Sequence, residues 1–167
     1  TQGLNPNGSL ANAWEILVLP AGSPVPVAGG IPVSGTPTYT ATGLLPGTAY
    51  VVYVRAVCSS SDKSEWATKN FAVAPTNDAC TGALFAVVNQ NLTCGQTTPG
   101  TITGATQSLP ATTCGGAGGA NDDVWFTFTA TSVTHIVSFN NVLPNIALGF
   151  EILSGTDCTN LTQVGCN

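Results

Sequence analysis

Charge is scarce in this chain of 167 residues: only 7% of its side chains are charged, against roughly 25% in ordinary globular proteins. The three basic residues are Arg55, Lys63 and Lys69, and the formal net charge is −5. Three scattered cations cannot form a basic patch, so we expect neither nucleic acid nor an anionic membrane as a partner. Solubility must come instead from Thr, Ser, Asn, Gln and Gly, which is typical of a secreted protein rich in β-structure.

Long apolar runs and helical periodicity are also missing. No apolar run approaches the ~20 residues needed to span a bilayer, so we expect no membrane insertion. No stretch keeps a 3.6-residue apolar period, which argues against amphipathic helices. Hydrophobic residues nevertheless make up 43% of the chain, enough to build a core, and Gly and Pro separate short β-branched runs. This pattern predicts an all-β fold of the sandwich or barrel kind.

Two sets of strands are expected, separated by a short polar linker that contains a proline. The first set covers residues 13–19, 38–42, 49–58 and 66–74. The second set covers residues 83–89, 101–108, 123–130, 134–140 and 146–153. The linker, APTND at residues 74–78, has the composition of a domain boundary. The sequence therefore predicts two tandem β-sandwich domains, over residues 1–75 and 76–167.

Six cysteines are dispersed along the chain, without a C-x-x-C pair and without histidines at zinc-ligand spacing. They are Cys58, Cys80, Cys94, Cys114, Cys158 and Cys166. This arrangement favours disulfides over a metal or redox site, and with them an oxidising compartment. Cys158 and Cys166 bracket one short polar segment, so they are the predicted pair. Two of Cys80, Cys94 and Cys114 are expected to form a further bridge, and the sequence leaves open which two.

Residues 50–57 (YVVYVRAV) are largely apolar at both the odd and the even positions. Successive residues of a strand point to opposite faces of the sheet, so this segment is expected to be a central strand, covered on both sides. A Leu-Pro-Gly turn precedes Tyr50, which begins the strand. That order is typical of the tyrosine corner of β-sandwiches, in which the tyrosine hydroxyl is hydrogen-bonded to the backbone of the preceding loop.

The first half contains the stretches GLLPGTAY at residues 43–50, YVRA at 53–56 and WEILV at 14–18. The first two resemble the region from strand E to strand F of fibronectin type III domains, and the third resembles strand C of these domains. Cys58 followed by KSEW is similar to the variant found in secreted proteins of Bacteroidota. The resemblance implies that residues 1–75 lack strands A and B, since only 13 residues precede the expected strand C, and that Cys58 has its partner upstream of Thr1.

The second half contains four distinctive stretches: NDAC at 77–80, NDDVWFTF at 121–128, SGTDC at 154–158 and LTQVGC at 161–166. With them it resembles another module of such proteins, the jelly-roll-like domains related to bacterial pre-peptidase C-terminal domains. The resemblance implies that residues 76–167 lack the closing strands of the domain. Modules of this family occur in type IX-secreted adhesins and as accessory domains of secreted hydrolases, which implies stalk, adhesion or accessory roles.

No residue is predicted to be catalytic. His135 is the only histidine, lies in an apolar run and is not accompanied by a nucleophile motif, which favours a structural role. Asp122 and Asp123 are adjacent, so in a strand they point to opposite faces and cannot act as an acid/base pair. Together with Asn77 or Asp78 they could supply oxygen ligands to Ca²⁺, the one cofactor considered. The alternative is a turn in which these side chains bind local backbone N–H groups.

Trp125 is the candidate ligand-binding residue, because its neighbours Val124 and Phe126 point to the opposite face of the expected strand. An exposed Trp125 could stack on a sugar, whereas the alternative is burial under a loop. We therefore expect a non-catalytic module of a bacterial cell-surface adhesin, stalk or filament. Its expected partners are other modules of the same polypeptide, neighbouring copies, and surface glycans or proteins. The alternative is an accessory region of a secreted hydrolase that binds carbohydrate.

Overall fold

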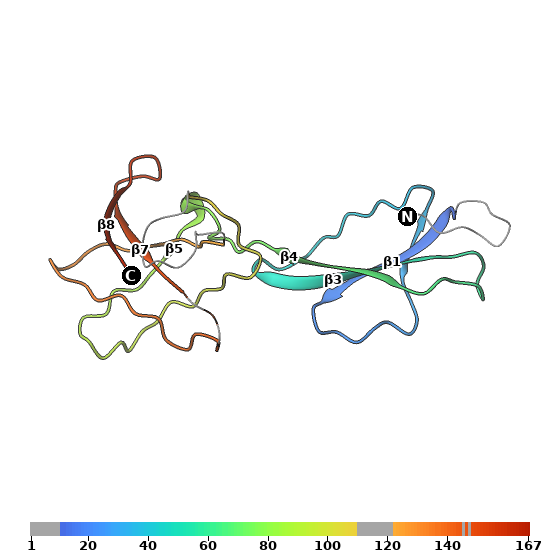
Figure 1. The fold of residues 1–167 in the computed structure, drawn as a ribbon, viewed down its shortest axis with the longest axis horizontal. Coiled ribbons are helices and arrows are strands. Elements are labelled where there is room, and N and C mark those ends of the chain that lie inside the picture. The colour runs from blue at the N-terminus through green and yellow to red at the C-terminus, as the bar shows by residue number, and fades with distance from the viewer. Residues whose placement is uncertain (1–10, 110–121, 145, 147) are drawn as a thin grey trace. The chain divides into compact units, whose positions relative to one another are not determined.

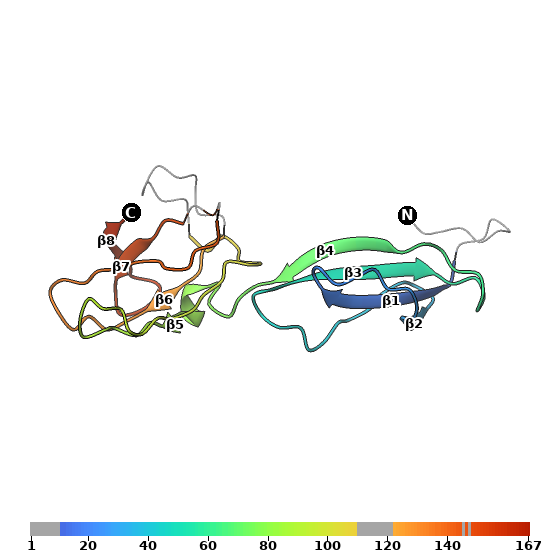
Figure 2. The ribbon, with the colours of Figure 1, turned by 90° about the horizontal axis from the view of Figure 1, so that it is seen from below.

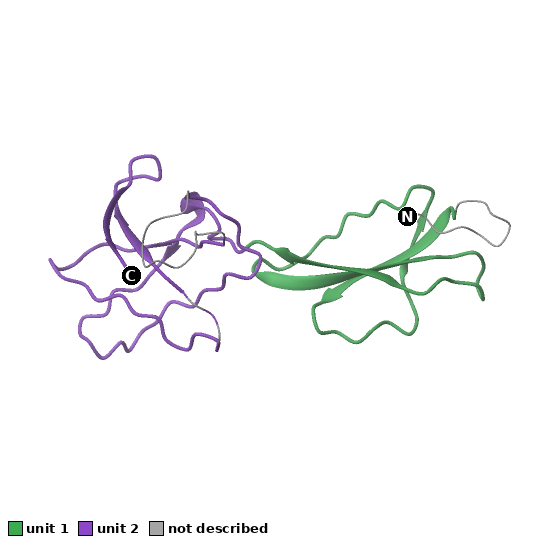
Figure 3. Ribbon diagram, viewed as in Figure 1, with its two compact units in different colours: residues 1–74 green, residues 75–167 purple. Residues whose placement is uncertain are grey.

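The computed structural model describes residues 11–109, 122–144, 146 and 148–167, and the chain is all-β. It divides into two compact units, unit 1 over Thr1–Ala74 and unit 2 over Pro75–Asn167 (Figure 3). Within the described ranges, no helix has the length and the hydrophobicity needed to cross a membrane.

Unit 1 is built on one four-stranded antiparallel sheet (Figures 1 and 2). Its strands are β1 (Ala13–Pro20), β2 (Ile31–Ser34), β3 (Thr48–Ala56) and β4 (Ala67–Val73). Their order is β2-β1-β3-β4, so β3 is bonded on one side to β1 and on the other to β4. This confirms that the segment with two apolar faces is a central strand.

One hydrophobic cluster of unit 1 lies on the face of the sheet that carries Trp14, while Val51 and Tyr53 are buried on the opposite face. Trp14 of β1 is paired with Val33 of β2 and with Ala56 of β3, so all three side chains share that face. Trp14, Ala56 and Ala11 are buried together, with Val33 and Val54 packed against them. The indole N–H of Trp14 donates to the carbonyl oxygen of residue 35 at 3.1 Å, which satisfies its polar atom at the edge of the core.

The predicted tyrosine corner is confirmed. Tyr50 is buried at the start of β3, and its hydroxyl accepts a hydrogen bond of 2.8 Å from the backbone N–H of Leu45. Gly47, in the turn between them, has φ 64°, a left-handed conformation that glycine adopts without strain. The Tyr50 ring stacks on Phe71 of β4, with the centroids 5.7 Å apart. The connection that enters β3 is thereby fixed to the sheet.

Replacing Tyr50 by phenylalanine should lower the free energy of unfolding of unit 1 by about 1 kcal/mol, because the Leu45 N–H loses its partner while the ring stays packed. Urea denaturation measures the difference. Tyr39→Phe is the matched control, since Tyr39 is exposed and its change should have no effect beyond about 0.5 kcal/mol. Equal destabilisation by both variants would contradict a specific role for the Tyr50 hydroxyl.

The strand expected at residues 38–42 is wrong; the second strand of unit 1 is β2, at Ile31–Ser34. The N–H of Thr38 turns back to the carbonyl of Thr36, and Pro37 between them has no N–H to donate to a ladder. Residues 31–34 instead pair with the first half of β1, where Ser34 faces Ala13.

Unit 2 has much less regular structure. Its described elements are a 3₁₀ turn η1 (Cys80–Gly82), β5 (Leu84–Phe85) parallel to β6 (Phe126–Thr127), and β7 (Glu151–Ser154) antiparallel to β8 (Thr162–Cys166). Among the described residues of this unit, only Pro75 and Asn77 are buried. Many large apolar side chains are exposed, including Phe85, Leu92, Val133, Ile136 and Leu143. The described part of unit 2 therefore has no hydrophobic core.

The strands expected in unit 2 are mostly shortened or wrong. Segments 83–89, 123–130 and 146–153 contain strands of only two to four residues, and β8 was not expected. Segments 101–108 and 134–140 form no strand. In the first of these, Gly104 has φ 75° and the N–H of Ala105 turns back to Ile102. Such a turn cannot continue a ladder.

The predicted Cys158–Cys166 disulfide is wrong: Cys158 is bonded to Cys80, with 5.8 Å between their Cα atoms. Cys158 lies in the loop of the β7–β8 hairpin, which the pair Ser154–Thr162 closes. Cys166 ends β8, four residues or about 13 Å along the strand from Thr162, so the strand leads away from the loop that holds Cys158. Spacing in the sequence suggested proximity, but the hairpin separates the two residues.

The remaining cysteines also depart from expectation. Cys166 is itself disulfide-bonded. The bridge expected between two of Cys80, Cys94 and Cys114 is wrong, because Cys80 is bonded to Cys158 and Cys94 is an exposed free thiol. Cys94 lies in a local turn with φ 49°, directly after a loop that Asn91 closes. Cys114 lies outside the described residues, and a partner of Cys58 upstream of Thr1 stays a prediction.

Candidate functional site

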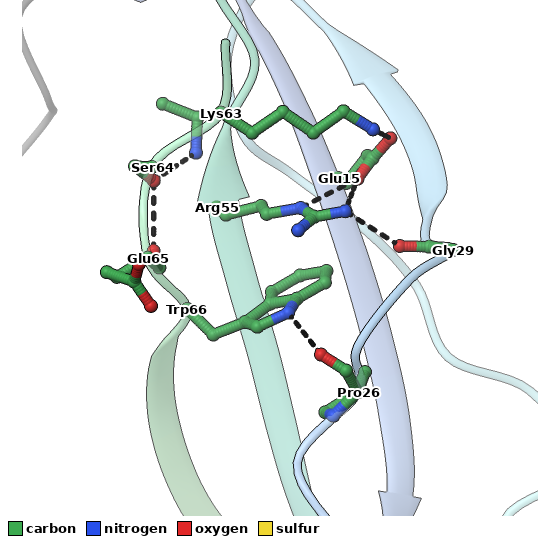
Figure 4. A network of polar contacts seen from close by, with 9 residues as sticks. Glu15, Pro26, Gly29, Arg55, Lys63, Ser64, Glu65 and Trp66 are labelled. Carbon is green, nitrogen blue, oxygen red and sulfur yellow. Dashed lines mark hydrogen bonds and ion pairs between the residues drawn. The ribbon is translucent and has the colours of Figure 1, made fainter. Parts of the chain in front are cut away.

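A network of polar side chains lies on the sheet of unit 1 (Figure 4). It is on the face opposite Trp14. We call it the Glu15 cluster; its members are Glu15, Arg55, Lys63 and Trp66. Glu15 of β1 is directly opposite Arg55 of β3. Lys63 belongs to the connection from β3 to β4 and is placed by a bridge to Val57, and Trp66 immediately precedes β4. Three segments distant in sequence thus meet at one carboxylate.

Both oxygens of the Glu15 carboxylate are engaged. Oε2 accepts from Nε of Arg55 at 2.8 Å and is 2.6 Å from Nη2, and Oε1 accepts from Nζ of Lys63 at 2.6 Å. The Glu15 side chain is 15% exposed, so the ion pairs are partly shielded from water. The Lys63 hydrogen bond, with a smaller contribution from Arg55, holds the pKa of Glu15 below its usual range, against the effect of burial.

Trp66 extends the cluster to the connection between β1 and β2. The guanidinium carbon of Arg55 lies 4.2 Å from the centre of the indole ring, a cation–π contact. The indole N–H donates to the carbonyl of Pro26 at 2.9 Å, and Arg55 also reaches the carbonyl of Gly29 at 3.3 Å. The cluster therefore ties two connections to the sheet. A carboxylate held ionised between two cations is a structural anchor and a poor proton donor.

Glu15→Gln should destabilise unit 1 by about 1 kcal/mol near neutral pH, because two partly shielded cations lose their counter-charge. The pKa of Glu15 is lower in the folded state than in the unfolded state. The ionised carboxylate therefore stabilises the fold fully at pH values above the unfolded-state pKa. This stabilisation is lost as the pH falls through the folded-state pKa. Urea denaturation at several pH values should show that the difference in free energy of unfolding between wild type and Glu15→Gln becomes smaller below about pH 4. Glu65→Gln, at an exposed position, is the control; a difference that does not change with pH would contradict the ion-pair role.

In unit 2, the two motifs expected to carry a site do meet. Trp125 donates its backbone N–H to the carbonyl of Asn77 at 2.8 Å, and the Asn77 side-chain amide donates to the carbonyl of Trp125 at 2.9 Å. Asn77 is 2% exposed. The buried side-chain amide of Asn77 and its backbone carbonyl both bind the backbone of Trp125, and so they join segment 77–80 to segment 122–125.

The predicted calcium ligands are engaged with backbone and hydroxyl donors. Asp78 accepts from the N–H and the hydroxyl of Thr106, at 2.6 and 2.8 Å. Asp123 accepts from the N–H and the hydroxyl of Ser108, at 3.0 and 2.9 Å. Asp122 is exposed. These donors lie 28 and 15 residues away in the sequence, so the contacts are not those of the local turn considered as the alternative. In the described part of the chain, no three His, Cys, Asp or Glu side chains are grouped to hold a metal ion.

Trp125 and His135 are both engaged in hydrogen bonds within unit 2. The indole N–H of Trp125 donates to the hydroxyl of Ser108 at 2.7 Å, and the residue is half-buried. His135 lies outside any strand, where its Nε2 accepts from the N–H groups of Thr131 and Ser132, at 3.1 and 3.2 Å. Its ring packs edge-on against Phe128. A ring nitrogen that accepts two backbone donors stabilises a turn.

The Glu15 cluster was not recognised from the sequence, although a signal was present. Glu15 and Arg55 are the only charged residues in their strands, and they have opposite signs. An isolated charge in an otherwise apolar strand needs a partner of opposite charge. Glu15 and Arg55, in the two expected strands, are such partners for each other.

Comparison with known proteins adds no family assignment to this geometry. No protein-family model matches the chain, and no curated protein and no solved structure is significantly similar to it. The likeness to fibronectin type III and jelly-roll-like modules therefore stays a hypothesis based on the motifs of the chain.

Proposed function

We propose that this chain is a non-catalytic part of a secreted bacterial cell-surface adhesin, stalk or filament protein, where it mediates attachment or spacing. The observation that carries the proposal is the hydrogen bond from Leu45 to the Tyr50 hydroxyl on the central strand of an antiparallel sheet. It supports a fibronectin type III-like unit, a module that recurs in extracellular arrays. A second unit closed by a disulfide follows it.

The disulfide and the amino-acid composition of the chain support an extracellular location. A disulfide between Cys80 and Cys158 persists in oxidising compartments and is rare in the cytosol. The low content of charged residues and the many Thr, Ser, Asn and Gly residues fit a secreted protein. Type IX secretion to the bacterial surface is the route that the resemblance implies.

Bead retention tests the proposal directly. Beads coated with the full chain should be retained on surfaces that carry further copies, matrix protein or glycans, while peptide, ester and glycoside substrates in the same buffer stay intact. Beads coated with chain that has been heat-denatured, reduced and alkylated are the control. Turnover of a substrate that disappears in His135→Ala would overturn the proposal.

The second candidate is an accessory, carbohydrate-binding region of a secreted hydrolase. It is favoured by the half-buried Trp125, whose ring could contact a sugar while its N–H stays on Ser108. Glycan-array binding that is lost in Trp125→Ala but kept in Ser108→Ala would favour this candidate. Genomic sequence on either side of the coding region separates the two further: repeated β modules favour an adhesin, and a hydrolase domain favours the accessory role.

A further inference from the structure

The Cys80–Cys158 disulfide joins residues that are 78 positions apart in the sequence. Cys80 begins η1, five residues after the start of unit 2, and Cys158 lies in the loop of the β7–β8 hairpin, near the end of the chain. Their Cα atoms are 5.8 Å apart. The shortest covalent path through unit 2 therefore passes from residue 80 through the disulfide to residue 158. Residues 81–157, which are most of the unit, form a closed loop outside this path.

Among the described residues of this loop, noncovalent contacts offer little resistance to stretching. The β5–β6 ladder is two residues long on each side, and the β7–β8 pairing is a single hairpin, a structure that is marginally stable alone. Among the described residues of unit 2, only Pro75 and Asn77 are buried, so no hydrophobic core opposes extension there. Without the disulfide, a pulling force would straighten the loop.

We propose that the Cys80–Cys158 disulfide makes unit 2 a short, inextensible connector under tension. The inference rests on the proposed role in a stalk or adhesin, because only such a role loads the chain along its length. Tension then travels through the covalent bond, and residues 81–157 bear none of it. Under strong tension, only residues 75–80 and 158–167 of unit 2 can straighten, which is on the order of 50 Å of chain. The looped segment stays in place to make contacts while the connector is under load.

Single-molecule stretching of the full chain, held at its two ends through handles attached without thiol chemistry, tests the proposal. Fully stretched, the oxidised chain should measure about 310 Å, because residues 1–80 and 158–167 and the disulfide alone lie on the path. A phosphine reductant attacks one sulfur and breaks the S–S bond, and one water molecule then supplies the oxygen of the phosphine oxide and the protons of the two thiols. The reduced chain should then measure about 570 Å, a gain of about 260 Å, and unit 2 should add this length at low force.

Variants identify the bond responsible. Cys166→Ser should keep the short length under oxidising conditions, because the Cys80–Cys158 bond is retained, and Cys94→Ser should do the same because Cys94 is a free thiol. A length of about 570 Å for the oxidised wild type would overturn the proposal. So would a reduced chain that keeps the short length, or one that gains its extra length only at high force, since unit 2 would then resist tension by itself. Failure of the adhesion assay would leave these lengths unchanged, so the two proposals can fail separately.

Discussion

Trp14→Ala is expected to lower the free energy of unfolding of unit 1 by about 3–5 kcal/mol. Trp14 is the largest side chain of the small core cluster, which it shares with Ala11 and Ala56. Its removal leaves a cavity between β1, β2 and β3, because the neighbouring side chains are small or anchored in the sheet. The change also leaves the carbonyl of residue 35 without its indole donor. A domain stabilised by roughly 5–15 kcal/mol loses a large part of its stability in this way.

Hydrogen-exchange mass spectrometry resolves this effect by peptide. Protection should fall in the peptides of β1, β3 and β4 and stay unchanged in unit 2. Trp14→Phe restores most of the volume and should cost clearly less than Trp14→Ala. Val27→Ala, at a side chain that is 98% exposed, should stay within about 0.5 kcal/mol of wild type. A Trp14→Ala protein with wild-type protection in β1 and β3 would show that this cluster is not the core of unit 1.

Gly82→Ala is expected to destabilise the start of unit 2 by about 1–3 kcal/mol. A Cβ atom at Gly82 would lie 2.2 Å from the carbonyl oxygen of Thr76, a backbone atom that cannot rotate away. Either η1 or the segment before it must shift. Both carry essential contacts: η1 begins with the bridged Cys80, and Asn77 follows Thr76 directly. The substitution should therefore loosen the junction between segments 77–80 and 122–125.

Gly95→Ala is the matched control, because an added Cβ there meets no atom within 4 Å. It should leave the exchange of the peptide around residues 76–86 unchanged, whereas Gly82→Ala should accelerate it. The peptide around Trp125, bonded to Asn77, should respond together with it. Identical exchange in the two variants would mean that the close approach at Gly82 is relieved without disturbing the junction.

Unit 1 could be predicted well from the sequence because its signals are local. The two apolar faces at residues 50–57 indicated a central strand, and the Pro-Gly turn before Tyr50 indicated the tyrosine corner. The exception was the strand expected at 38–42, where Pro37 and a local turn override the β-branched residues. The Glu15 cluster depends on register between β1 and β3, which a single strand does not reveal.

Unit 2 could be predicted poorly because its contacts are nonlocal and polar. Segment 101–108 has strand-like composition, yet the N–H groups of Thr106 and Ser108 are taken by the carboxylates of Asp78 and Asp123. Those partners lie 28 and 15 residues away, so no local pattern reveals them. The disulfide likewise joins Cys158 to a cysteine 78 positions away and not to its near neighbour in sequence.

The two outer strands of the unit 1 sheet bear on self-association. An outer strand leaves one row of backbone N–H and C=O groups open to pairing with another chain, which is how sheets aggregate. Here β2 is only four residues long and contains Pro32, while β4 carries the exposed Lys69. Lys69 is one of only three basic residues in the chain, and it lies on β4, the longer of the two outer strands. Crowded copies at a surface would thus be kept from joining edge to edge by a short strand with a proline on one side and a single positive charge on the other.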